Sequence, residues 1–463
     1  MSDLVTTDAT GASGAMGSSL YRAVWRWHFY AGLIVAPFLT ILALSGLVML
    51  YGNSIETFLG KKYHVAPGGT ATLEEQATAA VAAVPNGKLK LVVSPAEPDR
   101  ATVVLVTADG QDHAVSVDPN GAKVVGQIVK DETWFYWANT IHGKLMIGDI
   151  GDHIMEISAG LGIVLVLSGV YLWWPRGRRT FKDALGVNLK ARGRPLWKEL
   201  HSAVGFWFAL VLLGFLLSGL AWSGVWGRQI VQAWSTFPAA KWDNVPLSDK
   251  THAAMNHGAL KEVPWALEQT PMPMSGSMAG MPGMQHEMPI NLDTVAQLAR
   301  DIGFNGQFRI NVPADATGVY TVSADSMDGD TTNPMGDRTV HIDRYTGKIL
   351  ADVKFADYPI GGKAMAIGVA FHQGNVGWWN TAINLIFCLG ILFMTASGVV
   401  MWWKRRPSGA LGAPRYPRAF RPTVVVMAIA AAVCAAFPLT GIAIVFFAII
   451  DFLLPKRFKE AVA

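Results

Sequence analysis

Four histidines lie on or just before long apolar runs of this sequence, where an ionisable side chain is costly. His28 opens "HFYAGLIVAPFLTILALSG", and His201 opens "HSAVGFWFALVLLGFLLSG". His142 and His372 each lead into a further apolar run. Neutral imidazole is a good ligand for iron and other transition metals. Metal binding is therefore the chemistry that these residues predict, against the alternative that each is an ordinary polar residue at a membrane surface.

An internal repeat relates the four histidines in pairs. His28 and His201 each stand seventeen residues before a Ser-Gly pair. The motif "SGVYLWWPR" is similar to "SGVVMWWKR" later in the chain, and counting back from the two motifs reaches His142 and His372, which align to within one residue. The repeat indicates two parallel halves related by an axis along the membrane normal.

One more histidine, His153, competes for the role of His142 because it lies closer to the apolar run. Its counterpart in the second half is Ala382, so the repeat does not support it, and His153 is kept as a reserve ligand. The remaining histidines of the polar segments are interpreted as surface residues: His64, His113, His252, His257 and His341.

The elements that must position these residues are membrane spans. Of the 463 residues, 51% are hydrophobic and 16% are charged, which is typical of a polytopic membrane protein. The net charge of +4 suggests no nucleic-acid partner. Clear apolar runs cover about 26–50, 153–174, 202–226 and 379–403. A fifth region, 422–454, is too long for one ordinary span, and Pro438 predicts a hairpin of two short helices rather than one kinked span.

Basic clusters such as "WWPRGRR" and "WWKRRP" flank the spans and predict their cytoplasmic ends. They favour about six spans with both chain ends in the cytoplasm. Two long polar segments then fall outside. Each holds a helix-like stretch, "TLEEQATAAVAAV" or "NLDTVAQLARDIG", followed by alternating strands with turns, so each predicts a small α+β module. The acidic stretch "DSMDGDTTNPMGD" at 325–337 is acidic enough to contact a cation, but it is interpreted as a solvated turn.

This topology places His28 and His201 near the cytoplasmic face and His142 and His372 near the outer face. Two facing imidazoles can hold one haem iron from both axial sides, and an iron with both positions filled transfers electrons rather than binding oxygen. The sequence therefore predicts two haems at two depths. Zinc or copper sites usually need three or four clustered ligands, and only pairs are found here.

A methionine-rich stretch, "MPMSGSMAGMPGMQHEM" at 272–288, lies in the second outer segment. Soft thioethers select Cu(I), so copper contact is one interpretation and an adaptable apolar loop is the other. The candidate copper ligands are Met272, Met274, Met278, Met281, Met284, Met288 and His286.

The ordered motifs "WHFYAGL…LSGL", "IHGKL…SGVYLWWPR", "LHSAVGFW…LSGL" and "FHQGNVG…SGVVMWWKRR" resemble the PepSY-associated transmembrane protein family over about 22–455. "VHIDRYTGKIL" resembles a PepSY domain, and 111–126 resembles a weaker second copy. The family includes inner-membrane haem reductases of the ferric-siderophore type. The resemblance implies a bacterial inner-membrane location and carries the haem ligands over to His28, His142, His201 and His372.

The predicted fold class is thus a polytopic α-helical membrane protein of two parallel-related halves with two periplasmic α+β PepSY-like modules. The predicted segments are a disordered cytoplasmic tail (1–21), four spans with their outer histidine segments (22–52, 141–176, 198–227 and 371–405), periplasmic modules (53–140 and 228–370), cytoplasmic loops (177–197 and 406–421) and a helical hairpin (422–455).

The predicted function is a di-haem b-type electron-transfer protein, an oxidoreductase that reduces a periplasmic metal complex, either a ferric siderophore or another Fe(III) chelate, or Cu(II). No Gly-x-Gly-x-x-Gly motif opens a helix after a strand, so the cytoplasmic electron donor is separate: a flavin reductase, reduced flavin or quinol. The alternatives are a non-enzymatic membrane-anchored PepSY binding or regulatory protein, and a metal transporter, for which Asn384 is the polar residue within a span.

Overall fold

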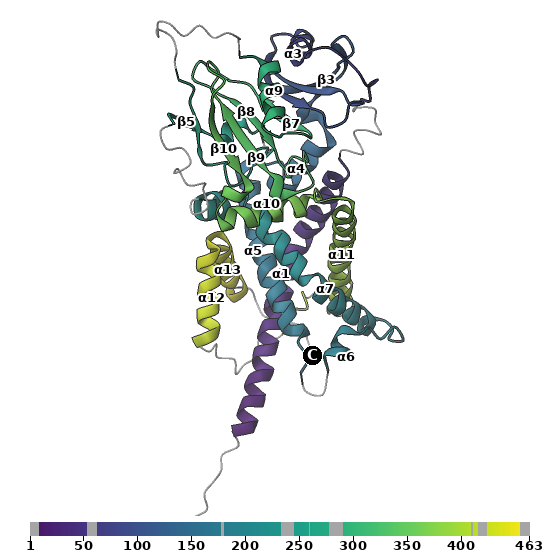
Figure 1. Ribbon diagram of the computed structural model, residues 1–463. Coiled ribbons are helices and arrows are strands. Elements are labelled where there is room, and N and C mark those ends of the chain that lie inside the picture. The colour runs from purple at the N-terminus through teal and green to yellow at the C-terminus, as the bar shows by residue number, and fades with distance from the viewer. Residues whose placement is uncertain are drawn as a thin grey trace, which may run out of the picture. The chain divides into compact units, whose positions relative to one another are not determined.

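The computed structural model describes residues 9–52, 63–176, 180–232, 245–258, 260–276, 290–408, 411–414 and 424–453 (Figure 1). The chain divides into two compact units, and each is described by itself. The helical unit comprises Met1–Leu44, Gly143–Gln229 and Ile386–Ala463. The sheet unit comprises Ser45–His142 and Ile230–Leu385.

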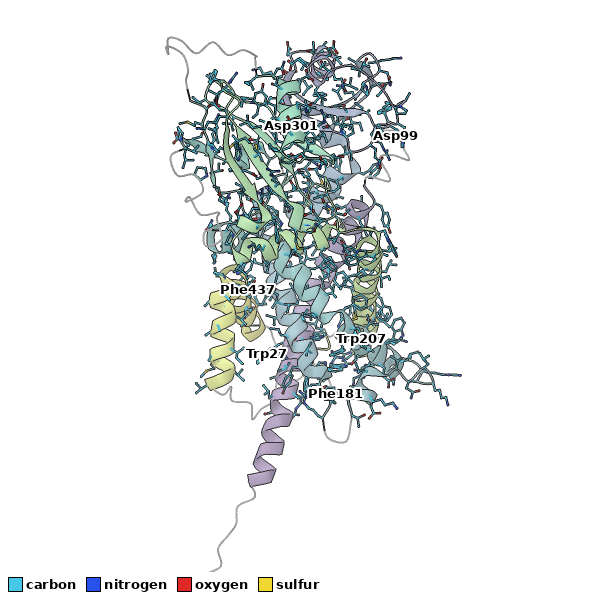
Figure 2. The ribbon with its side chains drawn as sticks, viewed as in Figure 1. Trp27, Asp99, Phe181, Trp207, Asp301 and Phe437 are labelled. Atoms are coloured by element: carbon cyan, nitrogen blue, oxygen red, sulfur yellow. The ribbon has the colours of Figure 1, made fainter. Side chains whose placement is uncertain are left out.

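The helical unit is built from apolar helices. Four are long and apolar enough to cross a membrane: Ser19–Leu50 within α1, α5, α7 and α11. Large apolar side chains face outward from them, as Trp207 of α7 does with 65% of its surface exposed (Figure 2). Such faces require lipid rather than water. The helices are α1 (Ala9–Leu50), α5 (Gly148–Trp173), α6 (Phe181–Leu185), α7 (Arg194–Leu220), the π-helix η2 (Gly224–Val231), α11 (Trp378–Trp403), α12 (Val424–Ala436) and α13 (Pro438–Leu453).

The C-terminal apolar region forms two helices, α12 and α13, which pack against each other in the helical unit (Figure 1). Phe437 separates them, and its ring stacks on Trp226 at 5.5 Å between centroids. The predicted break at Pro438 is therefore confirmed. Both helices are shorter than the four long ones, so a total of six spans stays a prediction.

The sheet unit contains one antiparallel sheet of eight strands in the order β10-β9-β8-β7-β1-β2-β3-β4. The strands are β1 (Lys88–Ser94), β2 (Thr102–Ala108), β3 (Gln111–Asp118), β4 (Lys123–Val129), β7 (Phe308–Asn311), β8 (Tyr320–Ala324), β9 (Arg338–Ile342) and β10 (Ile349–Lys354). A separate two-stranded sheet pairs β5 (Leu247–Thr251) with β6 (Pro271–Pro273). The short helices are η1 (Lys130–Glu132), α4 (Trp134–Lys144), η4 (His252–Met255), η5 (Pro334–Gly336), η6 (Phe355–Asp357) and α10 (Ile360–Gln373).

The two predicted modules share this one sheet rather than standing apart. Strands β1 and β7 pair antiparallel at its centre, with Val92 opposite Ile310 and Val93 opposite Arg309. An unpaired strand edge exposes a row of hydrogen-bonding groups, and the seam removes one such edge from each half. The sequence predicted β2–β4 and β8–β10 from their turns, but it did not predict β1 or β7.

One face of the sheet holds the apolar core, because alternate residues of the strands point to it. Val92, Val104, Ile310 and Val340 pack there against α3 (Leu73–Ala82) and α9 (Leu292–Asp301), which lie over the same face (Figure 1). A capping box starts each helix, on Thr72 and on Asn291. Both predicted helices are confirmed.

The opposite face of the sheet is polar, and the segment 252–268 covers it. His252 and His341 are both fully buried there, and their Nε2 atoms lie 3.0 Å apart. His252 Nδ1 lies 2.7 Å from the carbonyl of Thr270, so Nδ1–H must donate to it. His341 then donates from Nε2 and accepts from the Thr321 hydroxyl at 3.0 Å. The interpretation of these two residues as surface histidines is therefore wrong.

His257 is also buried, contrary to the prediction. Its Nδ1 donates to Asp112 at 2.8 Å, and its Nε2 donates to Asp131 at 2.7 Å. Asp112 lies on β3 of the first half, whereas His257 belongs to the covering segment of the second. The ion pairs thus tie the covering segment to the sheet.

We predict that low pH destabilises the sheet unit through His252 and His341. Burial lowers the pKa of His252 to about 4, and burial together with the charge of His252 lowers the pKa of His341 well below its usual value. Protons then bind preferentially to the unfolded chain, so the stabilisation is complete above pH 6.5 and is lost as the pH falls towards 4. For His252 the loss is about 3 kcal/mol.

The measurement is the thermal midpoint of the detergent-solubilised protein between about pH 7 and pH 5. The double variant His252→Gln/His341→Gln should have a smaller midpoint shift across this range than the wild type. His64→Gln is the control, because the His64 side chain is 57% exposed. Equal pH slopes for the wild type and the double variant would contradict the assignment.

Candidate functional site

His142 and His372 face each other in the sheet unit. His142 lies on α4 and His372 near the end of α10. Their ring centroids are 6.1 Å apart, and the ring planes are inclined by 72°. The Nδ1 of His142 lies 2.9 Å from the hydroxyl of Ser45, the serine of the first Ser-Gly motif. This bond leaves Nε2 as the nitrogen of His142 that is available to a metal.

The two remaining histidines of the repeat, His28 on α1 and His201 on α7, lie in the helical unit. Each of the two units therefore contains one histidine from each half of the repeat.

The His28 ring is oriented by a serine on the neighbouring long helix. Its Nδ1 lies 3.0 Å from Ser168 Oγ and 3.1 Å from the carbonyl of Leu165. A carbonyl only accepts, so Nδ1 must carry the proton. Ser168 donates its own proton to the same carbonyl at 3.1 Å, which leaves its oxygen as an acceptor. The lone pair of His28 is thereby assigned to Nε2.

The His201 ring has the equivalent environment, as the repeat requires. Its Nδ1 lies 2.8 Å from Ser397 Oγ, and Ser397 donates its proton to Met394 O at 2.9 Å. Nδ1–H of His201 is therefore the donor, and Nε2 holds the lone pair. Ser168 and Ser397 are therefore candidates for orienting the ligands. The sequence shows their matched spacing but not their contacts with the histidines.

The glycines of the same motifs provide space for the imidazole rings. A Cβ at Gly169 would lie 3.1 Å from His28 Cε1, and a Cβ at Gly398 would lie 3.7 Å from His201 Cε1. The first distance is tighter than a normal carbon contact. The Ser-Gly dipeptide thus combines a hydrogen-bond acceptor with the room that the ring needs.

His153 is exposed on α5, away from any such serine bond in the described residues. Its neighbours Asp152 and Glu156 have a structural role, since they accept hydrogen bonds from the backbone N–H groups that begin η2. The pairing of His142 with His372 favours His142 over His153 as the outer ligand.

Most of the copper candidates lie outside the residues that the structure describes. Met272 and Met274 are partly buried beside β6, where Met274 donates its backbone N–H to Pro246 O at 2.7 Å. Met278, Met281, Met284, Met288 and His286 lie outside the described residues. The copper hypothesis therefore stays a prediction.

The His142–His372 pair fits a metal ion held between two imidazoles, as in a haem with two histidine ligands. An imidazole nitrogen binds a metal at about 2.0 Å, so two rings on opposite sides of one ion have centres about 6 Å apart. The His142–His372 separation of 6.1 Å meets this requirement. Burial, and then the charge of His142, lower the pKa of His372 to about 3, so its ring is neutral as ligation requires.

The end of α10 that carries His372 is held by an asparagine of α11. Asn384 donates to the carbonyl oxygens of Phe371 and His372 at 2.8 and 2.9 Å, and Asn380 donates to Phe371 O at 2.9 Å. These carbonyls lie in the last turn of α10, and Phe371 O also accepts from the backbone N–H of Gly374 at 3.2 Å. Asn384, the residue that suggested a transport path, therefore has a structural role.

Long apolar helices and an α+β sheet together define a polytopic membrane protein in which each unit contains two histidines of the repeat. The chain belongs to the PepSY-associated TM region family, whose model matches residues 25–405. The match includes all four paired histidines and both halves of the sheet, and it ends before α12. No curated protein sequence matches the chain.

We predict that Asn384→Ala loosens His372. The substitution removes the Asn384 donor from the half-buried carbonyls of Phe371 and His372, of which Phe371 O keeps Asn380, so it should cost about 1 kcal/mol of unfolding free energy. The thermal midpoint should fall, and the variant should retain less metal or haem at the His142–His372 site. Asn305→Ala, at an exposed position, is the matched control. A variant as stable and as fully loaded as the wild type would disprove this role.

Proposed function

We propose that the protein is a di-haem b-type transmembrane electron-transfer protein. In this proposal, His28 and His201 hold one haem b, and His142 and His372 hold a second. The protein acts as an oxidoreductase in the inner membrane of a bacterium, with its N-terminus in the cytoplasm. The observation that carries the proposal is the 6.1 Å separation of the His142 and His372 rings, each contributed by a different half of the repeat.

Bound haem iron would carry single electrons by alternating between its ferric and ferrous states. The protein contributes two neutral imidazoles to each site. Held by two imidazoles, the group would be suited to electron transfer rather than to binding oxygen or substrate. Ser168 and Ser397 keep the proton on Nδ1 of His28 and His201, which holds Nε2 towards the metal.

The direction of transfer follows from the basic flanks of the spans. Arginine and lysine clusters mark the side of His28 and His201 as cytoplasmic. Electrons then enter there from a flavin reductase, reduced flavin or quinol, and leave at the side of His142 and His372. The acceptor is a periplasmic metal chelate, either a ferric siderophore or another Fe(III) complex, or Cu(II). One electron converts Fe(III) to Fe(II), which its chelator binds less tightly.

Single histidine substitutions test the ligand assignment. His28→Ala or His201→Ala should remove one haem per chain, and His142→Ala or His372→Ala should remove the other, because only one of the two imidazoles that would hold each haem then remains. His153→Ala should retain both. The measurement is the haem-to-protein ratio from the Soret and reduced α bands of the purified protein.

Purified protein that contains no haem, despite adequate iron and haem supply during expression, would overturn the proposal. It would favour the alternative of a membrane-anchored PepSY binding or regulatory protein. His64→Ala is a control for substitution of an exposed histidine.

Serine substitutions test the orientation of the ligands. Ser168→Ala and Ser397→Ala remove a hydrogen-bond acceptor from Nδ1–H, which makes the imidazole a weaker donor and destabilises the ferric state. The midpoint potential of the corresponding haem should rise by about 30 mV, roughly half of the 59 mV per tenfold change of a one-electron couple. Redox titration followed in the visible spectrum measures the shift.

Ser158→Ala is the matched control, because Ser158 is a buried serine of α5 that bonds only its own helix, at Ile154 O. An unchanged potential in both serine variants, with haem fully bound, would rule out this role. The acceptor is identified separately, by mixing dithionite-reduced protein with ferric siderophores or with Cu(II) and recording which one reoxidises it.

A further inference from the structure

The acidic loop 325–337, which joins β8 to β9, is folded into the sheet unit instead of forming a solvated turn. Asp325 is 1% exposed and Asp337 is 3% exposed. The backbone N–H of Asp330 donates to Asp325 O at 2.9 Å, and Asp337 accepts from Ser326 N at 2.8 Å. The loop therefore presents its carboxylates inward.

Three of these carboxylates converge. Asp325, Asp328 and Asp330 each offer an oxygen, and the three oxygens lie within 4.8 Å of one another. Calcium binds oxygen at about 2.3–2.6 Å, so two ligands on opposite sides of one ion are about 5 Å apart. The spacing of the cluster is thus small enough for all three residues to share one ion.

Among the described residues, Arg309 pairs with the cluster, with Nε 3.0 Å from Asp330 Oδ2 and Nη1 2.9 Å from Asp328 Oδ2. One guanidinium against three ionised carboxylates would leave two negative charges. A buried charge without a counter-ion is strongly unfavourable. A single divalent cation would neutralise the cluster.

Two buried oxygens next to the cluster lack hydrogen-bond partners. Asp325 Oδ2 is one, although the residue is almost completely buried, and the hydroxyl of Thr339 is the other. Thr339, Asp328 and Glu262 line a cavity of about 20 Å³ on the polar face of the sheet. This volume suits one water molecule or one ion and excludes an organic ligand.

From these contacts we infer that Asp325, Asp328 and Asp330 bind one divalent cation that prefers oxygen ligands, with Ca²⁺ favoured over Mg²⁺. Calcium accepts irregular sets of six to eight oxygens, and water completes the set, whereas Mg²⁺ demands a near-ideal octahedron. Arg309 remains paired with Asp330. Its positive charge reduces the net negative charge of the three carboxylates to the amount that one divalent cation neutralises.

The cation would brace the helix that carries His372. Asn375 follows α10, and its Nδ2 donates to the carbonyl oxygens of Ser326 and Met327, each at 2.9 Å. These carbonyls lie within the acidic loop, between the proposed ligands Asp325 and Asp328. Ion binding in the loop therefore acts directly on the backbone that anchors the end of α10. Cation binding by this loop does not depend on whether the protein binds haem.

Calorimetric titration of the EDTA-treated full-length protein in detergent with CaCl₂, and separately with MgCl₂, tests the site. We expect one calcium ion per chain, with a dissociation constant on the order of 10⁻⁴–10⁻³ M, as in extracellular calcium modules, and weaker magnesium binding. Asp325→Asn should weaken calcium binding by about tenfold or more. Asp301→Asn is the control, because Asp301 is an exposed carboxylate at the end of α9 (Figure 2).

The absence of saturable calcium or magnesium binding by the wild type would overturn the inference, as would unchanged binding by Asp325→Asn. Thermal unfolding, measured with and without calcium, distinguishes loss of the site from misfolding of the variant. Calcium should raise the midpoint of the wild type and of Asp301→Asn, but not that of Asp325→Asn, which should unfold cooperatively without calcium because it has lost a buried charge. A wild-type midpoint that is insensitive to calcium would show that Arg309 and bound protons suffice.

Discussion

A histidine can bind a metal only through a nitrogen that has a lone pair, and in this protein a serine on another helix decides which nitrogen that is. The Ser168 and Ser397 hydroxyls each donate to their own helix and are left to accept from an imidazole. This arrangement requires α1 to keep one register against α5, and α7 to keep the same register against α11. The small residue after each serine makes that approach feasible, so helix packing and ligand orientation depend on the same dipeptide.

The sheet unit obeys a different constraint, because its two faces have opposite characters. The apolar face is closed by α3 and α9, and hydrophobic burial stabilises it without directional demands. The other face carries buried polar groups, and each must find a specific partner. The neutral His252–His341 pair and the ion pairs of His257 meet this requirement. Removal of one partner there costs more than loss of the same area on the apolar face.

Sequence periodicity predicted much of the architecture. The apolar runs, the break at Pro438 and the strands flanked by Asp-Gly and Asn-Gly turns all have local signals. Strand β7 alternates as "FRIN", with Arg309 and Asn311 facing the polar side, but its four residues are too few for the alternation to identify a strand. Strand β1 alternates as "KLKL", yet it is not followed by a turn that identifies a hairpin. The seam between them is a long-range pairing, which no local pattern encodes.

The candidate site was predicted in part for a related reason. The repeat identifies His28 and its partners because duplication leaves matched spacings. It does not indicate that a serine binds each ring, since that contact joins helices far apart in the sequence. The burial of His252 and Asp325 was missed because polar residues between strands are normally exposed. Their burial depends on a covering segment and a loop whose positions follow from the folded sheet.

The central pairing of β1 with β7 has a consequence for the origin of the chain. A single half of the repeat would leave unpaired the strand edge that now forms the seam, and it holds one histidine from each pair. Two identical half-length chains could join at that edge and complete both pairs, as a symmetric homodimer. In one fused chain the halves are free to differ. The second half contains the acidic loop and the methionine-rich segment, which the first half lacks.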